Sequence, residues 1–269
     1  MSSTQSQQTI VVVGATGIQG SGVVRALLSD EYGGPWLVRA LTQDPSSGKA
    51  QKLLSEYQTT DNRLSLASGH VYDETSLRSA FTGAHGVFAM TSERYPGKRI
   101  TEEEELKHEI DAGRNIISAA KECCIKHLVF SSLPDTVEAS DGQFKRIHHM
   151  NNKHTIEQLA RKELDGFTSL MPGPRITPEG MAKAFTRVTG KPAVHSPISF
   201  EEFGHLSSAL VGPAFKEDAI EMMQWAAIAP TDKTCYGAFE LEVEQSSEEL
   251  GLTGSSFEDW LRRSGWTGP

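Results

Sequence analysis

The segment that most constrains this chain runs from Thr9 to Leu28, where a strand pattern, a glycine turn and a helix pattern follow one another. The strand pattern is the β-branched run Thr9–Val13. Glycines then recur at every third position, at Gly14, Gly17 and Gly20. Apolar residues at helical spacing come next: Val23, Val24, Leu27 and Leu28. Such a turn lets the backbone approach a pyrophosphate, and the free N–H groups at the helix start attract its charge, so the pattern predicts a dinucleotide site.

Strand and helix patterns alternate through the first two-thirds of the chain. Further strands are expected at 36–41, 64–67, 86–90, 127–131 and 167–171, and helices at 49–57, 74–81, 101–124 and 152–162. In the longest helix we expect Thr101 as the cap with Glu104 at the capping-box position. Its buried stripe is expected at Leu106, Ile110, Gly113, Ile117 and Ala120. Repeated strand–helix units predict an α/β fold with a doubly wound parallel sheet that binds ligands at the carboxyl ends of its strands.

Beyond Pro172 the alternation stops and the patterns become mainly helical. Thr177 is the expected cap of a helix with Pro178 at its first position, and Ser199 is the expected cap of a later one. We therefore expect a Rossmann-like nucleotide-binding domain over residues 1–172 and a smaller, mostly helical substrate-side subdomain over residues 173–269.

The composition argues against several partners and sites. The 269 residues carry a net charge of −9 at pH 7 and a pI of about 5.5, which disfavours direct binding to nucleic acid or to acidic membranes. The polar start of the chain has no apolar signal region, so we expect a cytoplasmic protein, with the nucleus as the alternative. The spacing of His148, His149 and His154 matches no zinc pattern, so we expect no metal.

Several motifs together resemble the NmrA-like proteins, an atypical branch of the short-chain dehydrogenases/reductases, and the fungal members look most similar. The motifs are GATGIQG at 14–20, TQDP at 42–45, SSLPD at 131–135, HHMNNKHTIEQLARKEL at 148–164 and TPEGMAKAFTRVTGKP at 177–192. The resemblance covers nearly the whole chain and implies a Rossmann fold that binds NADP or NAD, with NADP slightly favoured. Some members of the family are redox-sensing regulators that bind a partner protein, and others are reductases, several of them in fungal secondary metabolism.

The resemblance also implies which residues contact the nucleotide. The loop is formed by Gly14, Ala15, Thr16, Gly17, Ile18 and Gln19. After the second strand, relatives usually have an arginine that grips the 2′-phosphate of NADP, but this chain has Gln43, which is followed by Asp44. Glutamine supplies no charge, so the choice between NADP and NAD stays open, and Lys49 or Lys52 are alternative cations.

Two more contact segments and one departure follow from the resemblance. On the adenine side, relatives have Gly-Asp where this chain has Gly69 and His70, so His70 and Val71 are the expected contacts. Thr91, Ser92 and Glu93 resemble the segment beside the nicotinamide ribose. After Pro172, relatives continue into an aromatic–Glu–Asn segment and several tens of further residues that this chain lacks. We therefore expect part of the active-site wall to be missing or rebuilt.

The catalytic residues of ordinary short-chain dehydrogenases are only partly present. Those enzymes use a serine at the end of strand five and a Tyr-x-x-x-Lys motif on the next helix. Here Ser131 and Ser132 end the strand and Lys153 matches the lysine, but His149 occupies the tyrosine position. One hypothesis is hydride transfer with Ser131, with His149 or His148 as the acid, and with Lys153 on the ribose. The alternatives are that Lys153 is a solvated lysine at the helix start and that His149 is a loop histidine without chemistry.

Two functions stay open at this point. The first is an NAD(P)-dependent oxidoreductase that reduces a small carbonyl or imine metabolite, with a role in fungal secondary metabolism. The second is a non-catalytic NAD(P)-sensing regulator whose occupancy is read by a protein partner. The missing tyrosine and the missing nicotinamide-side segment favour the sensor, whereas the reductase members of the family favour the enzyme, which we prefer.

Overall fold

The computed structural model describes residues 7–29, 36–170, 176–230, 233–240 and 255–268. The contacts divide the chain into two units. One unit combines Met1–Leu133 with His148–Leu170, and the other combines Pro134–Ile147 with Met171–Pro269. The predicted domain boundary after residue 172 stays a prediction, and the contacts group one earlier segment, Pro134–Ile147, with the C-terminal unit.

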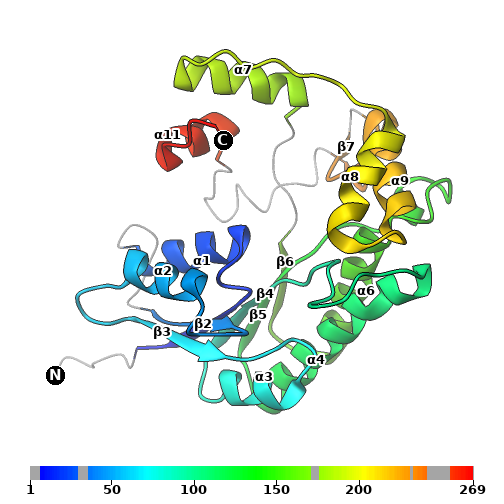
Figure 1. Ribbon diagram of the computed structural model, residues 1–269. Helices are drawn as coiled ribbons and strands as arrows, with labels where there is room; N and C mark the ends of the chain where they lie inside the picture. Colours follow the sequence, from blue (N-terminus) through cyan, green and yellow to red (C-terminus); the bar gives the residue numbers. More distant parts are fainter. Residues whose placement is uncertain (1–6, 30–35, 171–175, 231–232, 241–254, 269) are drawn as a thin grey trace. The chain divides into compact units, whose positions relative to one another are not determined.

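A parallel six-stranded sheet forms the centre of the first unit (Figure 1). Its strands are β1 (Thr9–Val13), β2 (Leu37–Thr42), β3 (Leu64–Ser68), β4 (Gly86–Ala89), β5 (His127–Ser131) and β6 (Phe167–Leu170). The strand order is β3-β2-β1-β4-β5-β6, and every neighbouring pair is parallel. The predicted doubly wound α/β fold is therefore confirmed, and the order reverses direction between β1 and β4, the position at which such sheets bind ligands.

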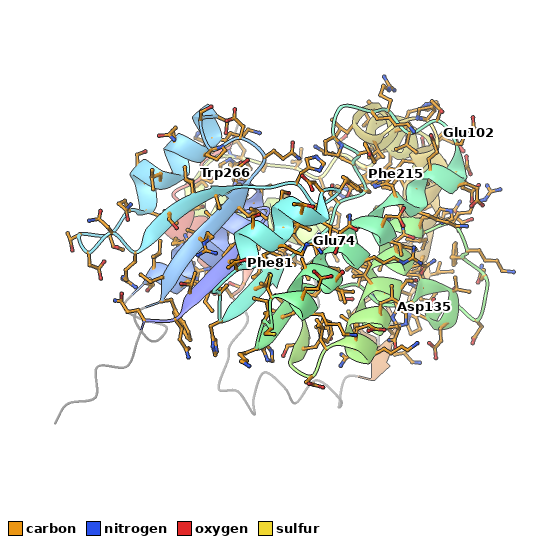
Figure 2. All side chains as sticks on the ribbon, turned by 90° about the horizontal axis from the view of Figure 1, so that it is seen from below. Glu74, Phe81, Glu102, Asp135, Phe215 and Trp266 are labelled. Carbon is orange, nitrogen blue, oxygen red and sulfur yellow. The ribbon has the colours of Figure 1, made fainter. Side chains whose placement is uncertain are left out.

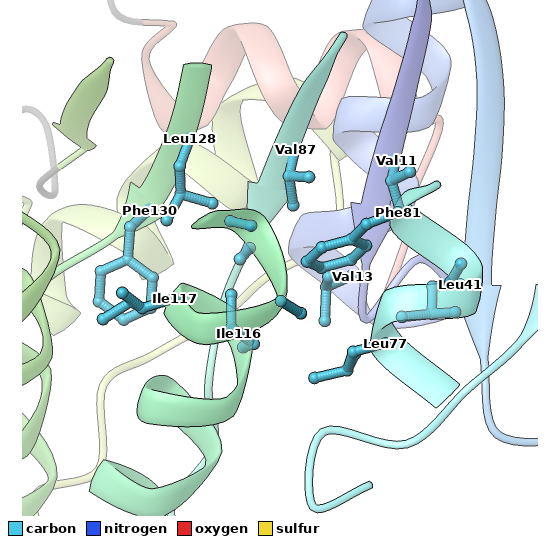
Figure 3. Packing of buried hydrophobic residues seen from close by; sticks show 14 of the residues in the cluster. Val11, Val13, Leu41, Leu77, Phe81, Val87, Ile116, Ile117, Leu128 and Phe130 are labelled. Atoms are coloured by element: carbon cyan, nitrogen blue, oxygen red, sulfur yellow. The ribbon is translucent and has the colours of Figure 1, made fainter. Parts of the chain in front are cut away.

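Helices cover both faces of this sheet (Figure 1). On one face lie α1 (Ile18–Leu28) and α2 (Gly48–Tyr57), and on the other lie α3 (Glu74–Phe81), α4 (His108–Glu122) and α6 (His148–Glu163). Alternate residues of a strand point to opposite faces, so Val12 joins the α1/α2 core while Val11 and Val13 join the other. Figure 3 shows Val11 and Val13 in the second cluster, together with Phe81 of α3.

The prediction of one helix over 101–124 is wrong at its start. Residues Glu103–Lys107 form a 3-10 helix, η1, and α4 begins only at His108. Glu102, labelled in Figure 2, is the cap, and Glu105 accepts hydrogen bonds from the backbone N–H groups of Thr101 (3.1 Å) and Glu102 (3.3 Å). Lys98 also pairs with Glu105, which fixes this carboxylate as the capping group in place of Glu104.

The second unit is mostly helical in its described residues. Its elements are α5 (Thr136–Ala139), α7 (Pro178–Thr189), α8 (Phe200–Val211), α9 (Phe215–Ile228), α11 (Phe257–Ser264) and the short antiparallel pair β7 (Lys233–Thr234) and β8 (Phe239–Glu240). The predicted cap Thr177 accepts a hydrogen bond from the Gly180 N–H, and the predicted cap Ser199 accepts one from the Glu202 N–H. Helix α7 pairs with α11 through Arg187 and Glu258. In the described residues, no helix combines the length and the apolar character needed to cross a membrane.

Candidate functional site

The glycine turn between β1 and α1 forms a close-packed cradle. Gly14 has a φ of +70°, a conformation that favours glycine, and the Gly17 N–H donates a hydrogen bond to the Gly14 carbonyl at 3.0 Å. A Cβ added to Gly20 would lie only 2.2 Å from the Gly14 oxygen, so α1 can approach β1 only with glycine there. In the described part of the chain, no side chain caps the start of α1, which leaves its first N–H groups for a ligand. These features fit the pyrophosphate of a dinucleotide.

A cavity of about 460 Å³ lies at the carboxyl ends of β1, β2, β3 and β4. Eight of the residues predicted to bind the cofactor line it: Gly14, Thr16, Gly17, Gln43, Asp44, Val71, Thr91 and Ser92. Four separate strand ends thus contribute to one concave site of the size that small ligands and cofactors use. Their contact with a cofactor stays a prediction.

The other predicted residues of this set lie outside the cavity lining. Ala15 is fully buried behind the turn, whereas Ile18 is 98% exposed. Ring nitrogen Nδ1 of His70 accepts the Tyr72 backbone N–H at 3.2 Å, so His70 positions the backbone of a residue that does line the cavity. The backbone carbonyl of Glu93 lies 3.2 Å from Nε2 of His108.

The β2 side of the cavity carries a fixed negative charge. Asp44 accepts hydrogen bonds from the Ser46 hydroxyl (2.6 Å) and the Ser46 backbone N–H (2.8 Å), which lower the pKa of the Asp44 carboxyl. Among the described residues that line the cavity, Arg94 is the sole cation, and the sequence pattern did not indicate it. Lys49 and Lys52 are exposed on α2. Among the described residues that line the cavity, the end of β2 therefore presents Asp44 and Gln43, and the cation comes from the segment after β4.

Tyr72, a second residue that the sequence patterns did not indicate, forms an aromatic wall of the cavity. Its hydroxyl lies 2.5 Å from Nδ1 of His108, and its ring stacks on Tyr95 at a centroid distance of 4.6 Å. Because Nε2 of His108 faces the Glu93 carbonyl, Nε2 is the donor and Nδ1 accepts the Tyr72 hydroxyl proton. Burial raises the pKa of the Tyr72 phenol, and the charge of Glu109 raises it further. This wall is therefore neutral at physiological pH.

Two predicted residues from distant parts of the chain meet at the end of β5. The side-chain amide of Gln19 donates a hydrogen bond to the Ser131 hydroxyl at 2.9 Å. Gln19 is in the first turn of α1, so the nucleotide loop is joined directly to the predicted catalytic serine. The neighbouring Ser132 is buried and points to the Lys153 backbone carbonyl at 3.4 Å.

The predicted catalytic lysine is buried and ion-paired. Lys153 is 9% exposed and lies one turn after His149 on α6, since this helix begins at His148. The interpretations of Lys153 as a solvated lysine at a helix start and of His149 as a loop residue are both wrong. The Lys153 ammonium pairs with Glu109 of α4, and the Thr91 hydroxyl donates to the same carboxylate oxygen, Oε1, at 2.6 Å.

Glu109 is the main site residue that the sequence reading missed. It is fully buried, whereas the predicted stripe residue Ile110 is only half-buried. The observed buried stripe of α4 includes Ala112, Ile116 and Ala119. Glu109 lies three residues before Ala112 and therefore on the same face of the helix. A carboxylate at a buried position of the apolar pattern was the sequence feature that could have indicated Glu109.

His148, at the start of α6, has a carboxylate partner. Nε2 of His148 lies 2.8 Å from an oxygen of Glu103. Within the described ranges, no three His, Cys, Asp or Glu side chains gather closely enough to hold a metal ion.

The strand order, the glycine turn and the cavity at the strand ends define a Rossmann-like α/β protein. Residues 6–171 match the model of the NmrA-like family. The chain therefore belongs to the NmrA-like family, as its motifs had indicated.

Curated relatives agree with this assignment. The chain is 37% identical over 163 residues to the NmrA-like family domain-containing oxidoreductase FrzB of Cladobotryum sp. This match covers 61% of this chain and 44% of FrzB. The chain is 35% identical over 155 residues to the corresponding oxidoreductase hkm9 of Aspergillus hancockii, covering 56% of this chain and 41% of that protein. The matched part thus spans less than half of either relative.

A solved structure shares the fold at low sequence identity. The NADPH-dependent quinone oxidoreductase QOR2 of Escherichia coli, complexed with NADPH, superposes with a TM-score of 0.56 at 16% identity. The match covers 96% of this chain and 100% of QOR2. At this identity the likeness shows the fold alone.

Proposed function

We propose that this chain is an NAD(P)-dependent oxidoreductase that reduces a small metabolite at a carbonyl or imine group. The observation that carries the proposal is the cavity at the ends of β1–β4, which the Gly14–Gly20 turn borders. Membership of a family with relatives named as oxidoreductases supports it. A nicotinamide coenzyme, when bound, supplies the hydride. A role in fungal secondary metabolism is part of the same proposal.

The residues divide the work between binding and proton transfer. The free N–H groups at the start of α1 bind the pyrophosphate, and Lys153 binds the ribose of the nicotinamide half. His149, one turn before Lys153 on α6, donates a proton to the substrate oxygen or nitrogen. Ser131, whose hydroxyl accepts a hydrogen bond from Gln19, orients that substrate atom.

The choice of coenzyme depends on the β2 end of the cavity. The family resemblance favours NADP, whereas the ionised Asp44 beside Gln43 favours the two ribose hydroxyls of NAD over a phosphate. Calorimetric Kd values for NADPH and NADH decide between them. Gln43→Arg should improve NADPH binding roughly tenfold, because arginine forms a bidentate pair with phosphate, and should leave NADH binding nearly unchanged.

A second candidate is a sensor that binds the coenzyme without turnover and presents its occupancy to a protein partner. The observation that favours it is His149 at the position where ordinary short-chain dehydrogenases have their tyrosine acid. In this case Lys153 and the glycine turn still bind the coenzyme, but no residue completes the proton transfer. Binding is then the whole function of the site.

Binding followed by a turnover assay separates the two candidates. The purified chain is titrated with NADPH and NADH, and the coenzyme that binds more tightly is then incubated with a panel of aldehydes, ketones and imines. Coenzyme oxidation that His149→Ala abolishes, with binding retained, supports the reductase. Tight binding without turnover supports the sensor. If the folded protein binds neither coenzyme, both candidates are wrong.

A further inference from the structure

The buried carboxylate of Glu109 has no role in the function proposed above. It is 0% exposed and lies on the face of α4 that otherwise buries Ala112, Ile116 and Ala119. Removing a carboxylate from water is strongly unfavourable unless it is paired and hydrogen-bonded. A helix of this kind would be more easily built with an apolar residue at this position. The contacts of Glu109 should therefore explain why a charge is kept there.

All the hydrogen bonds of this carboxylate converge on one oxygen. Lys153 and Thr91 both donate to Oε1, while Oε2 is buried and has no partner in the described part of the chain. One of the two carboxylate oxygens is therefore left unsatisfied, while Oε1 contacts both Thr91, just after β4, and Lys153 of α6. This arrangement is energetically unfavourable for the carboxylate, but it holds Lys153 and Thr91 at one oxygen.

The partner with the most freedom to lose is Lys153. A lysine side chain has four rotatable bonds and a point-like ammonium, so on its own it adopts many positions. Pairing with Glu109 restricts the ammonium to the neighbourhood of Thr91, which shares the same oxygen and lines the cavity. The backbone carbonyl of His149 lies 3.5 Å from the same ammonium.

We propose that Glu109 is a positioning residue, which fixes the Lys153 ammonium beside Thr91 so that the lysine can bind the nicotinamide-side ribose. The inference rests on the proposed function, because it assigns a role to Glu109 only through a bound coenzyme. Glu109 touches neither coenzyme nor substrate, and it acts through Lys153.

Glu157 on α6 provides a matched comparison. It is 3% exposed, its Oε1 accepts hydrogen bonds from two nitrogens of Arg161 at 2.7 and 2.9 Å, and its Oε2 is also buried without a partner in the described residues. Arg161 also donates a hydrogen bond to the Ser169 hydroxyl of β6. Neither Glu157 nor Arg161 is among the residues that line the cavity. Glu157 therefore reproduces the burial and pairing of Glu109 without the link to Thr91.

The experiment compares two ligands that differ at the group in question. Full-length Glu109→Gln is titrated with the preferred coenzyme and with ADP, which lacks the nicotinamide ribose. We expect the Kd for the coenzyme to rise roughly tenfold or more, the effect of one charge-assisted contact, while the Kd for ADP is unchanged. Glu157→Gln should leave both values unchanged. An equal loss for coenzyme and ADP would mean that Glu109 is only structural, and would overturn the inference.

A double-mutant cycle tests whether Glu109 acts through the lysine. In a Lys153→Met background, Glu109→Gln should weaken coenzyme binding no further, whereas a full additional loss would overturn the inference. If Glu109→Gln does not fold, Glu109→Asp keeps the charge on a shorter side chain, and the same comparison with ADP applies. Wild-type protein that binds neither coenzyme would refute the proposed function itself, an outcome distinct from a loss shared by coenzyme and ADP.

Discussion

The two faces of the central sheet bury different kinds of side chain. The α1/α2 face is packed with apolar residues such as Val12, Val24 and Phe88, and Arg63 donates to the carbonyl of Leu28 at the end of α1. The α3/α4/α6 face has a larger apolar cluster (Figure 3). On the helices that cover that second face, the buried residues also include Glu109, Asn152, Lys153 and Glu157.

The difference shows which part of the fold is shaped by more than packing. Buried charges reduce stability relative to well-packed apolar residues, so their concentration on one face indicates a task that apolar residues cannot perform. On α4 and α6, Glu109 and Lys153 form an ion pair that contacts Thr91 just after β4, and we propose that positioning this lysine is the task. The α1/α2 face contributes to the site through backbone geometry at Gly14 and Gly20 instead.

The largest expected effect concerns the backbone side of this comparison. In Gly20→Ala the new Cβ would lie 2.2 Å from the Gly14 oxygen, and only backbone movement can relieve the overlap. We expect a loss of roughly 4 kcal/mol or more in the free energy of unfolding, beyond the usual cost of overpacking. Gly22→Ala is the control, since a Cβ there meets nothing within 4 Å and should stabilise α1 by up to about 1 kcal/mol. Urea denaturation measures both, and equal effects would refute the close-approach argument.

The apolar packing of the two faces should be of similar strength. Phe81 on the α3/α4/α6 side (Figure 2) and Phe88 on the α1/α2 side are both buried. Phe81→Ala and Phe88→Ala should each lower the free energy of unfolding by about 3–5 kcal/mol. Ile18→Ala, at a 98% exposed position, should change it by less than about 0.5 kcal/mol. A cost near zero for either phenylalanine in thermal or urea unfolding would break the comparison.

Buried polar groups should cost less on removal than a phenylalanine but more than surface residues. The Asn152 side-chain amide donates to the Leu106 carbonyl at 2.8 Å in a buried environment. Asn152→Ala leaves this carbonyl without its donor, and we expect a loss of about 1–3 kcal/mol in urea unfolding. On the opposite face, Arg63→Met removes the donor to the Leu28 carbonyl and should fall in the same range. A stabilising Asn152→Ala would contradict the view that this polar group is satisfied.

The smallest expected effect lies on the surface, where a charge is easily tolerated. The hydrogen bond from Lys98, followed by those from the Thr101 and Glu102 N–H groups, lowers the pKa of Glu105 from 4.5 to about 2. A lowered folded-state pKa means that its contribution to stability is present above pH 4.5 and is lost as the pH falls through about 2. The difference in stability between wild type and Glu105→Gln should therefore shrink over this window. A difference that grows on acidification would contradict the assignment of Glu105 as the capping-box carboxylate of η1.

The fold was predictable because its signals are local. The run Thr9–Val13 and the glycines after it identify β1 and the turn without reference to the rest of the chain. The start of η1 was not predictable, because several neighbouring glutamates could cap it and the choice of Glu105 depends on Lys98, seven residues earlier. Likewise, α6 begins four residues before the predicted position 152.

The candidate site was predictable only where it depends on motif residues. The glycine turn, Gln43, Asp44 and Thr91 all line the cavity as their motifs suggested. Arg94 and Tyr72 were missed because no local pattern marks a residue that reaches a cavity from a loop. Glu109 was missed because its surroundings are set by β4 and α6, which are distant in sequence.

The shared oxygen of Glu109 also bears on how long the native state persists. It joins Glu109 to Thr91 and Lys153, which lie 18 and 44 residues away along the chain. The charges of Glu109 and Lys153 lose their hydration before their mutual attraction can compensate for it. Such a contact is expected to form after the rate-limiting step of folding, so its removal in Glu109→Gln should accelerate unfolding and leave refolding nearly unchanged in stopped-flow experiments. The Glu109 carboxylate, which we propose positions Lys153, would then also slow the unfolding of the native state.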